Sequence, residues 1–430
     1  MTANGHMMVN GHRWRTRLAD LASGRLLIDI GTSSLTGLRA RTLESELHPP
    51  LVAHPAYETL PLNADECASL GSDFQRVGPL FLRPAGGEDT CFTDAFGVKW
   101  LWAEGYPAQY QHPLEHADWP GIPKHPRPVL PQMVQIAQAQ GAPLVVADAP
   151  CPGLLDTCFA LRNGWQFLED ITGDWRIATA LLDWALETAA RAYEDMLDAL
   201  PCPPDVVVYG DDLGFQGGMY LSDMDFRNFL YPRLKTLISR IRAKTDAAIC
   251  LHSCGGVRSI LGELADLGIE MMNLDFYAKG MDLAEVRRKL PKALILHGAV
   301  DLIALGAAAK RGERAAVAKF AMELAAVGAS IQAPPDNISE DHFVGDCVAG
   351  AAAARALDQD DLKRLRNFGP ERAIIDQMIA AANRKVPVYA GTHPRVAIVD
   401  RAHPPQGHAG GATQPSIQAG NGQSPGAIGA

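Results

Sequence analysis

The chain has 430 residues, of which 47% are hydrophobic, and a formal net charge of -10. This length accommodates either two average domains or a single large α/β barrel with insertions. The negative charge argues against a general nucleic-acid surface and against an anionic membrane as a partner. No apolar run approaches the roughly 20 residues that cross a membrane, and the segment around Trp14 lacks the apolar core of a secretory signal.

Eight cysteines are dispersed along the chain. Their spacing shows no compact disulfide framework of the kind found in small secreted domains. We therefore expect the cysteines to be reduced, and we expect a cytoplasmic enzyme.

The composition divides the chain into three parts. Residues 1–24 are polar and are expected to be flexible. Residues 402–430 consist largely of Gly, Pro, Gln, Ala and Ser, which cannot bury enough apolar surface to offset chain entropy, so a disordered tail is predicted. Residues 25–385 are expected to form the functional domain. Within them, residues 45–130 are rich in Pro, Gly and aromatic side chains, which predicts an N-terminal elaboration with a hairpin at about 93–102.

Short apolar runs alternate with helical patterns through this domain. Several of the runs are apolar on both faces, as parallel strands covered by helices are. Repeated strand–helix units of this size indicate a parallel sheet. We predict an α/β fold, a (β/α)₈ TIM barrel, with one strand near 158–162. The other seven strands are predicted at 26–30, 144–147, 206–209, 247–251, 271–274, 293–296 and 330–333.

The helices between these strands carry recognisable end signals. Asp174 and Ser222 are suited to cap helix N-termini, because their side chains accept hydrogen bonds from free backbone N–H groups. Pro232 is expected to kink or split the helix that follows Ser222. A helix from about Val257 is expected to end at Gly268.

Polar side chains follow one predicted strand after another. In a parallel barrel all strand C-termini lie on one rim, where barrel enzymes build their active sites. A single Asp at such a position is most simply a helix cap, but these strand ends include two His and a Cys, which favours a functional site. The residues are Asp29, Asp148, Asp211, Asp212, His252, Cys254, Asn273, Asp275, His297 and Asp336.

His252 and Cys254 form the most specific cluster. In extended backbone, residues two apart point the same way, so the two side chains can face one small volume. Imidazole and thiolate are both zinc ligands, and two of them need one or two more from elsewhere. Gly255 and Gly256 lead into the helix expected from Val257, whose first N–H groups would favour the Cys254 thiolate. A His-x-Cys pair alone is more often explained by packing than by ligation.

A series of motifs also runs through the chain in a defined order. They are LGSDF at 70–74, TDAFGV at 93–98, DDLGFQG at 211–217, LS at 221–222, YPRLK at 231–235, HSCGG at 252–256, GMD at 280–282 and HGAVD at 297–301. Their combination resembles the uroporphyrinogen decarboxylase superfamily over about residues 25–357. The resemblance implies a (β/α)₈ barrel with its site on the C-terminal rim, in agreement with the strand pattern.

That superfamily has two well-known chemistries. One branch decarboxylates the acetate side chains of uroporphyrinogen without a metal or cofactor. The other transfers methyl groups between a corrinoid protein and a small molecule, often a thiol, with zinc at a His-x-Cys site. The arginine-containing segment of the decarboxylases is missing here, since residues 27–34 read LIDIGTSS. A substrate with many carboxylates needs guanidinium groups, so the chain is closer to the corrinoid-dependent methyltransferases.

The resemblance implies a zinc ion bound by His252 and Cys254. Zinc methyltransferases of this kind usually carry a second cysteine after the last barrel strand, but residues 332–338 contain none. Asp336 is expected to take its place, because zinc accepts carboxylate oxygen. Cys347 is expected instead to lie on a helix and to be buried in the hydrophobic core, because its neighbours in the sequence are apolar.

The remaining roles follow from the strand ends and the resemblance together. Asp212 and His297 are expected to orient substrate or move a proton. Asp29 and Asp148 are further catalytic candidates. The expected substrate-binding residues are Asp94, Gln216, Asn273 and Asp275.

The predicted function is therefore the transfer of a methyl group between a corrinoid protein and a small methylated substrate or thiol. No stretch resembles a corrinoid-binding Asp-x-His-x-x-Gly loop, so cobalamin is expected on a partner protein. One alternative is a uroporphyrinogen decarboxylase-type carboxy-lyase. The other is a non-catalytic barrel subunit, which the missing second cysteine would favour and which zinc analysis would distinguish from an enzyme.

Overall fold

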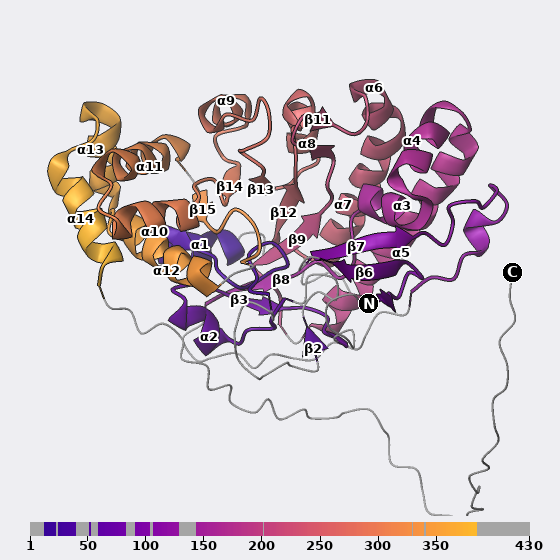
Figure 1. The fold of residues 1–430 in the computed structure, drawn as a ribbon, viewed down its shortest axis with the longest axis horizontal. Coiled ribbons are helices and arrows are strands. Elements are labelled where there is room, and N and C mark those ends of the chain that lie inside the picture. The colour runs from indigo at the N-terminus through magenta and orange to yellow at the C-terminus, as the bar shows by residue number, and fades with distance from the viewer. Residues whose placement is uncertain are drawn as a thin grey trace, which may run out of the picture. The chain divides into compact units, whose positions relative to one another are not determined.

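The fold is built around eight parallel strands that form a nearly closed barrel (Figure 1). The strands follow the order β1-β15-β14-β13-β12-β9-β8-β3 around the sheet, so barrel strands that are consecutive in the chain are paired from β3 to β15, and β15 pairs with β1. The predicted α/β barrel is confirmed. The computed structural model describes residues 13–22, 25–39, 51–52, 59–82, 91–103, 106–128, 143–200, 202–328, 330–338 and 341–384. The tail predicted at 402–430 lies outside these residues.

Each of the seven runs predicted as strands overlaps one barrel strand. The prediction of a strand at 158–162 is wrong, because this segment lies in helix α3 (Leu154–Arg162). The eighth strand is instead β3, within the segment predicted as an N-terminal elaboration. The barrel strands are β1 Leu27–Ile28, β3 Phe74–Val77, β8 Leu144–Ala147, β9 Val206–Gly210, β12 Ala248–Ser253, β13 Met271–Leu274, β14 Ile295–His297 and β15 Ser330–Gln332.

β3 carries two adjacent polar side chains in its middle. Gln75 and Arg76 are both buried. The Arg76 guanidinium is paired with the Asp148 carboxylate at the end of β8, with Nε 2.9 Å from Oδ2. Burying a charge is tolerable only when it is paired in this way. The strand therefore depends on a partner that is distant in the sequence, and its own residues do not form an apolar run.

Helix α1 (Arg13–Ala22) closes the N-terminal end of the barrel. Trp14 is 6% exposed and packs on a cluster of inward-facing strand residues. Arg17 bonds the Asp205 carboxylate and the carbonyl oxygen of Pro143, which directly precede β9 and β8. This helix lies within residues 1–24, whose expected flexibility stays a prediction. The cluster comprises Leu27, Phe74, Leu144, Val146, Val206, Val208, Ala248, Cys250, Met271, Ile295 and Ile331.

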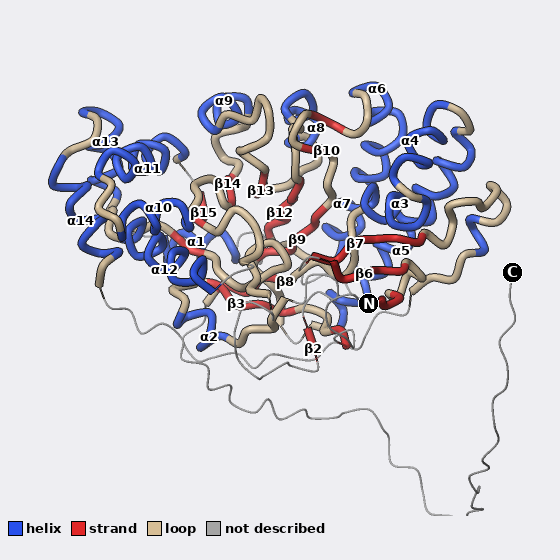
Figure 2. Tube along the Cα trace, in the orientation of Figure 1, coloured by secondary structure: helices blue, strands red, loops and turns tan. Residues whose placement is uncertain are grey.

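The larger helices lie outside the barrel strands (Figure 2). Asp174 and Ser222 cap helices as predicted, since each accepts a hydrogen bond from a backbone N–H in the first turn. Pro232 lies at the start of α7, directly after a π-helical segment at 226–230, so the helix is divided there. The helices are α2 Ala64–Ser69, α4 Gly164–Thr172, α5 Trp175–Ala199, α6 Asp223–Asp225, α7 Tyr231–Lys244, α8 Leu261–Ala265, α9 Leu283–Lys289, α10 Leu302–Lys310, α11 Arg314–Val327, α12 Asp341–Arg355, α13 Gln359–Phe368 and α14 Arg372–Ala382.

Short antiparallel strands are added to the barrel. The hairpin predicted at about 93–102 is present, with Thr93 paired to Lys99. A second hairpin follows β9 and lies next to the site described below. These strands are β5 Cys91–Thr93, β6 Lys99–Ala103 and β7 Tyr106–Gln111 in one sheet, β10 Gly214–Phe215 with β11 Gly218–Met219, and β2 Leu51–Val52 with β4 Phe81–Leu82.

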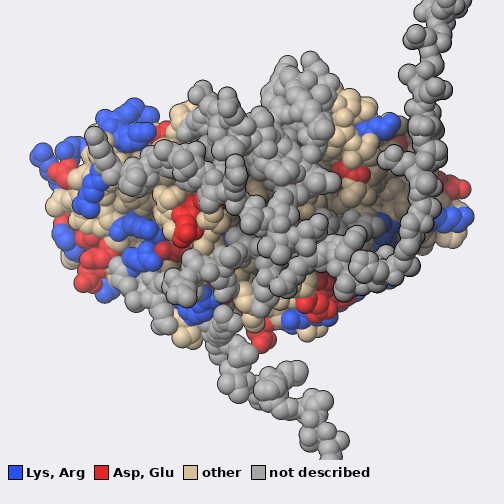
Figure 3. Space-filling view, turned by 90° about the horizontal axis from the view of Figure 1, so that it is seen from below, with Lys and Arg blue, Asp and Glu red and all other residues tan. Residues whose placement is uncertain are grey.

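The surface carries both signs of charge. Acidic and basic side chains are interspersed on the described part of the face shown in Figure 3. Exposed pairs of this kind include Arg311–Glu313 and Lys363–Asp360, which contribute little stability individually. Within the described part of the chain, no helix has the length and apolarity needed to cross a lipid bilayer.

Candidate metal centre

The strands β9 and β12 end beside each other on the C-terminal rim. In their register His252 pairs with Gly210, so the residues two positions further on, Asp212 and Cys254, come together. His252 Nε2 lies 3.4 Å from Cys254 Sγ and 3.4 Å from Asp212 Oδ1. One nitrogen, one sulfur and one oxygen therefore lie within 4.8 Å of one another.

The types and the spacing of these donor atoms are compatible with a bound zinc ion. Zinc binds His nitrogen and carboxylate oxygen at about 2.0–2.2 Å and Cys sulfur at about 2.3 Å. Two such ligands on a tetrahedral ion lie roughly 3.4–3.6 Å apart. The 3.4 Å separations from His252 Nε2 agree with this spacing. Three protein ligands leave a fourth position for a small molecule, which is the pattern of catalytic zinc.

The contacts among the three side chains shift their protonation. Burial lowers the pKa of His252, but its contacts with Asp212 and Cys254 raise it, and the net shift is upward. Burial and the neighbouring Asp212 raise the pKa of Cys254, His252 lowers it, and the net shift is upward. Burial also raises the pKa of Asp212, but His252 brings it below its usual range. Because His and Cys side chains bind metal in their deprotonated forms, metal binding at these residues would release protons.

The predicted stabilisation of the Cys254 thiolate by a helix N-terminus is not supported. The chain passes through a 3₁₀ turn at Arg258–Ile260 before α8 begins, so Cys254 lies outside the first turn of a helix. Burial instead raises the pKa of this thiol. A thiolate here therefore needs a cation beside it, and a bound metal ion is the strongest such partner.

The two glycines after Cys254 have a packing role. Gly255 has a φ of +81°, and a Cβ atom on it would lie 2.2 Å from the backbone carbon of Gly214. Gly256 donates a backbone hydrogen bond to Phe215 at 3.0 Å. The glycines therefore allow the β10–β11 hairpin to lie directly against the His-x-Cys loop.

Asp211 faces away from the metal centre and caps α3. Its carboxylate accepts hydrogen bonds from the backbone N–H groups of Leu155 and Asp156, at 2.9 and 3.1 Å, and from the Tyr209 hydroxyl at 2.7 Å. A Cβ atom on Gly153 would lie 2.3 Å from this carboxyl carbon, so only glycine fits there. Burial raises the pKa of Asp211 to about 6.

Asp156 is a site residue that the sequence did not reveal. It lies in the first turn of α3, and its Oδ2 accepts a hydrogen bond from the backbone N–H of Asp212 at 3.2 Å. Burial, followed by the neighbouring Asp212 charge, raises its pKa well above the usual range. Its position was hidden because part of α3 was predicted as a strand.

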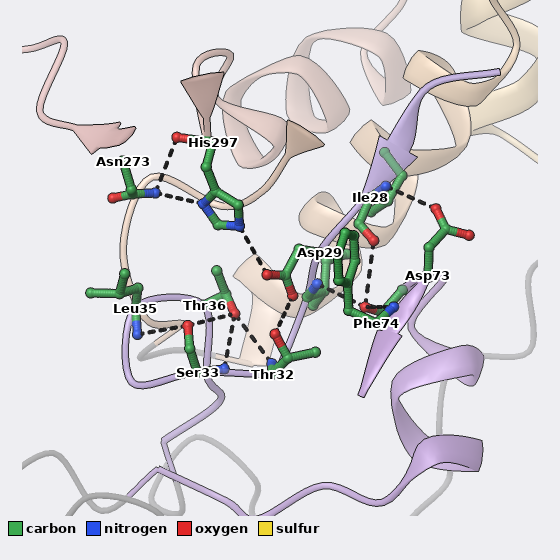
Figure 4. Close-up of polar contacts among 12 residues, drawn as sticks. Ile28, Asp29, Thr32, Ser33, Leu35, Thr36, Asp73, Phe74, Asn273 and His297 are labelled. Atoms are coloured by element: carbon green, nitrogen blue, oxygen red, sulfur yellow. Dashed lines mark hydrogen bonds and ion pairs between the residues drawn. The ribbon is translucent and has the colours of Figure 1, made fainter. Parts of the chain in front are cut away.

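A second set of predicted residues connects to the centre through His252. His252 Nδ1 lies 2.7 Å from Asn273 Oδ1, and Asn273 Nδ2 lies 2.8 Å from His297 Nδ1. His297 Nε2 in turn lies 2.9 Å from Asp29 Oδ2 (Figure 4). We call these four residues the polar row. The structure thus brings the catalytic candidates His297 and Asp29 and the substrate-binding candidate Asn273 into one hydrogen-bonded group with a metal-ligand candidate.

The catalytic candidate Asp148 is engaged by the protein itself. It is 1% exposed and pairs with Arg76. Its other oxygen accepts hydrogen bonds from the backbone N–H groups of Ser34 and Ala149, at 3.1 and 2.9 Å. Its contacts explain a structural role at the β3–β8 edge, and a catalytic role stays a prediction.

The remaining substrate-binding candidates fall into two places. Gln216 Nε2 donates to Asp275 Oδ2 at 2.6 Å, so these two residues lie together beside the His-x-Cys loop. Asp94 lies in the turn between β5 and β6 instead. Its carboxylate accepts hydrogen bonds from the backbone of Val98 at 3.0 Å and from the Trp100 indole at 2.8 Å. These contacts explain a turn-forming role for Asp94, and a substrate-binding role stays a prediction.

The structure does not bring Asp336 into the group of ligand atoms. Its side chain is exposed and accepts a hydrogen bond from the backbone N–H of its neighbour Asn337 at 2.6 Å. Among the described residues, Asp212 supplies the carboxylate that accompanies His252 and Cys254. Cys347 lies fully buried in α12, as its apolar neighbours predicted.

Comparison with known proteins agrees with the fold and with part of the site. Residues 162–339 match the model of the uroporphyrinogen decarboxylase (URO-D) family. This stretch contains β9 and β12 with all three candidate ligands, and the match confirms the resemblance predicted from the sequence.

A solved methyltransferase from Methanosarcina mazei is similar to this chain in fold. The TM-score is 0.52 and the identity 19%, and the similarity covers 79% of this chain and 98% of that chain. No curated protein sequence matches the chain. The chain thus has a barrel fold that it shares with a methyltransferase, and residues 162–339 are similar to the URO-D family.

Proposed function

We propose that this protein is a methyltransferase that moves a methyl group between a corrinoid protein and a small methylated substrate or thiol. The observation that carries the proposal is the convergence of Asp212, His252 and Cys254 at the C-terminal rim of the barrel. Its support is threefold: the donor set suits zinc, three ligands leave one position open, and the fold is that of a known methyltransferase.

Zinc bound at this site would lower the pKa of a coordinated thiol, or make a methylated heteroatom a better leaving group. The protein's own residues hold and orient the components. His252 presents Nε2 toward the site while Nδ1 is held by Asn273. The Asp212 side chain is 42% exposed, so the site opens to solvent and a substrate can reach it. Gln216 and Asp275 at the mouth are the proposed substrate contacts.

The corrinoid is proposed to arrive on a partner protein. The site lies on the barrel rim, where a large cofactor carried by another protein could approach. The eight cysteines are free, which is consistent with the reducing cytoplasm that we propose as its location.

The carboxy-lyase alternative has less support. A porphyrinogen with many carboxylates needs available guanidinium groups. The Arg76 guanidinium, buried on β3, donates to Asp148 and to the carbonyl oxygen of Pro79. Supplied with uroporphyrinogen, the protein is therefore expected to release little or no carbon dioxide, and robust formation of coproporphyrinogen would reverse our preference.

The proposed function is tested by zinc quantification on the purified protein, paired with a cob(I)alamin methylation assay across methylated substrates. We expect about one zinc per chain, and methylcobalamin formation that Cys254→Ser abolishes. A barrel that serves only as a binding subunit has no reason to retain stoichiometric zinc. Protein without zinc and without methyl transfer would support that alternative.

A further inference from the structure

The polar row follows the register of the barrel. His252 pairs with Asn273 between β12 and β13, and Asn273 pairs with His297 between β13 and β14. Three successive strands therefore place these side chains side by side, and Asp29, directly after β1, completes the row (Figure 4). Asn273 and His297 are 5% and 6% exposed, so water cannot readily replace these partners.

The orientation of the Asn273 amide is fixed by a backbone group. Asn273 Nδ2 lies 3.1 Å from the carbonyl oxygen of His297, which can only accept a hydrogen bond. The NH₂ group must therefore face His297, and its second hydrogen is directed at His297 Nδ1, 2.8 Å away. It follows that Asn273 Oδ1 faces His252, where it can only accept, so His252 Nδ1 must carry a proton.

The other end of the row is fixed in the same way. The Asp29 carboxylate accepts hydrogen bonds from the Thr32 hydroxyl and from His297 Nε2. His297 therefore donates through Nε2 and accepts through Nδ1. Gly298 leaves space for the arrangement, because its φ is +69° and a Cβ atom there would lie 2.8 Å from Asn273 Nδ2.

We propose that Asn273 is the positioning residue of the metal centre, and that it holds His252 in the orientation whose Nε2 lone pair is directed at the metal. The inference rests on the proposed function, because it concerns the same centre. An amide that can accept only on the His252 side excludes the tautomer in which Nδ1 would be the ligand atom. Partners of metal-bound histidines fix ring orientation and tautomer in this way, and their loss typically weakens metal binding about 10- to 100-fold.

The test compares metal affinity in three variants. Asn273→Leu has a similar volume and no polar atoms, and we expect Zn²⁺ and Co²⁺ affinity, measured by competition with a chelator, to fall about 10- to 100-fold. His297→Gln keeps Asn273 but removes its imidazole partner, and a smaller loss in the same direction is expected. Asn383→Leu is the control, since Asn383 also donates to backbone carbonyl oxygens but lies at the end of α14. It should leave affinity unchanged.

A second readout does not need a metal. In the metal-free protein, nuclear magnetic resonance should show a slowly exchanging Nδ1–H proton on His252, whether or not Nε2 is also protonated. This proton should exchange rapidly in Asn273→Leu. If that variant does not fold, His297→Gln carries the test through both readouts.

The outcomes separate this inference from the proposed function. Wild-type protein that binds metal, with unchanged affinity in folded Asn273→Leu, would overturn the positioning role and leave the metal centre standing. Wild-type protein that binds neither ion would defeat the proposed function and with it the metal-positioning role. The His252 proton would then still show whether Asn273 orients the ring.

Discussion

The two ends of the barrel are filled by different kinds of side chain. At the N-terminal end, Trp14 packs on apolar residues that begin the strands, such as Phe74. At the C-terminal end, the interior is occupied by Asp29, His297 and Asn273, whose polar atoms bond to one another. At the N-terminal end the side chains must fill the available volume. At the C-terminal end each buried polar atom must have a hydrogen-bond partner. Substitutions at the two ends should therefore change different properties of the protein.

The largest effect is expected from Cys254→Ser, and it should be confined to the rim. A serine hydroxyl is a poor metal ligand at neutral pH, whereas a thiolate is a strong one. We expect zinc affinity to fall by more than about 100-fold, because the loss of a ligand should exceed the loss of a ligand's partner. Zinc content, activity and the melting temperature of the metal-free protein are the measurements. A variant that retains its zinc would remove Cys254 from the ligand set.

Trp14→Ala tests the opposite end. Removing a large buried aromatic side chain should lower the free energy of unfolding by about 3–5 kcal/mol. Zinc affinity of the folded protein should stay the same, since Trp14 lies in the N-terminal layer. Denaturant titration measures the first quantity and chelator competition the second. Trp165→Ala is the matched control, because Trp165 is 80% exposed and its loss should have little effect.

Comparing Asp212→Asn with Asp336→Asn tests which carboxylate belongs to the candidate ligands on the rim. An amide oxygen can still coordinate but brings no charge, so Asp212→Asn should weaken zinc binding roughly 10-fold. Asp336→Asn should change it little, because Asp336 lies outside the group of ligand atoms. Isothermal titration of both variants provides the comparison. The reverse result would restore the carboxylate that the sequence predicted and would require the Asp336 side chain to leave the backbone of Asn337 and turn toward His252.

Cys347→Ala should have the smallest effect, on stability alone. The buried thiol leaves a small cavity in α12, and we expect a cost of about 1 kcal/mol in the free energy of unfolding. Zinc content should stay at the wild-type level. Loss of the metal in this variant would mean that α12 contributes to the site.

Most of the fold could be predicted because most of the barrel strands lie in apolar runs. β3 could not, since Gln75 and Arg76 interrupt its pattern, and the partner that makes Arg76 acceptable is Asp148 on another strand. The strand predicted at 158–162 shows the opposite error. Its apolar residues belong to a short buried helix, and periodicity alone does not separate the two over so few residues.

The candidate site could be predicted only in part, because sequence spacing specifies local neighbours and does not specify the pairing of distant strands. His252 and Cys254 are two residues apart on one strand, so the sequence itself places them together. The third donor depends on the pairing of His252 with Gly210, which brings Asp212 beside them and which spacing along the chain does not specify. Asp212 was predicted as a catalytic residue, and the structure places it among the candidate ligands.

The junction between β1 and β3 gives the barrel wall a seam. Across it, side chains take the place of a continuous ladder: Asp73 accepts from the backbone of Ile28 at 2.9 Å, and Ser72 from that of Ile30 at 3.1 Å. Fewer backbone bonds across a junction lower the cost of local opening. Asp29 lies between Ile28 and Ile30 in the chain. Local opening of the seam would therefore disturb the end of the polar row that is farthest from His252. We therefore expect local opening of the wall to reduce the order of His252 through the side-chain hydrogen bonds of the polar row.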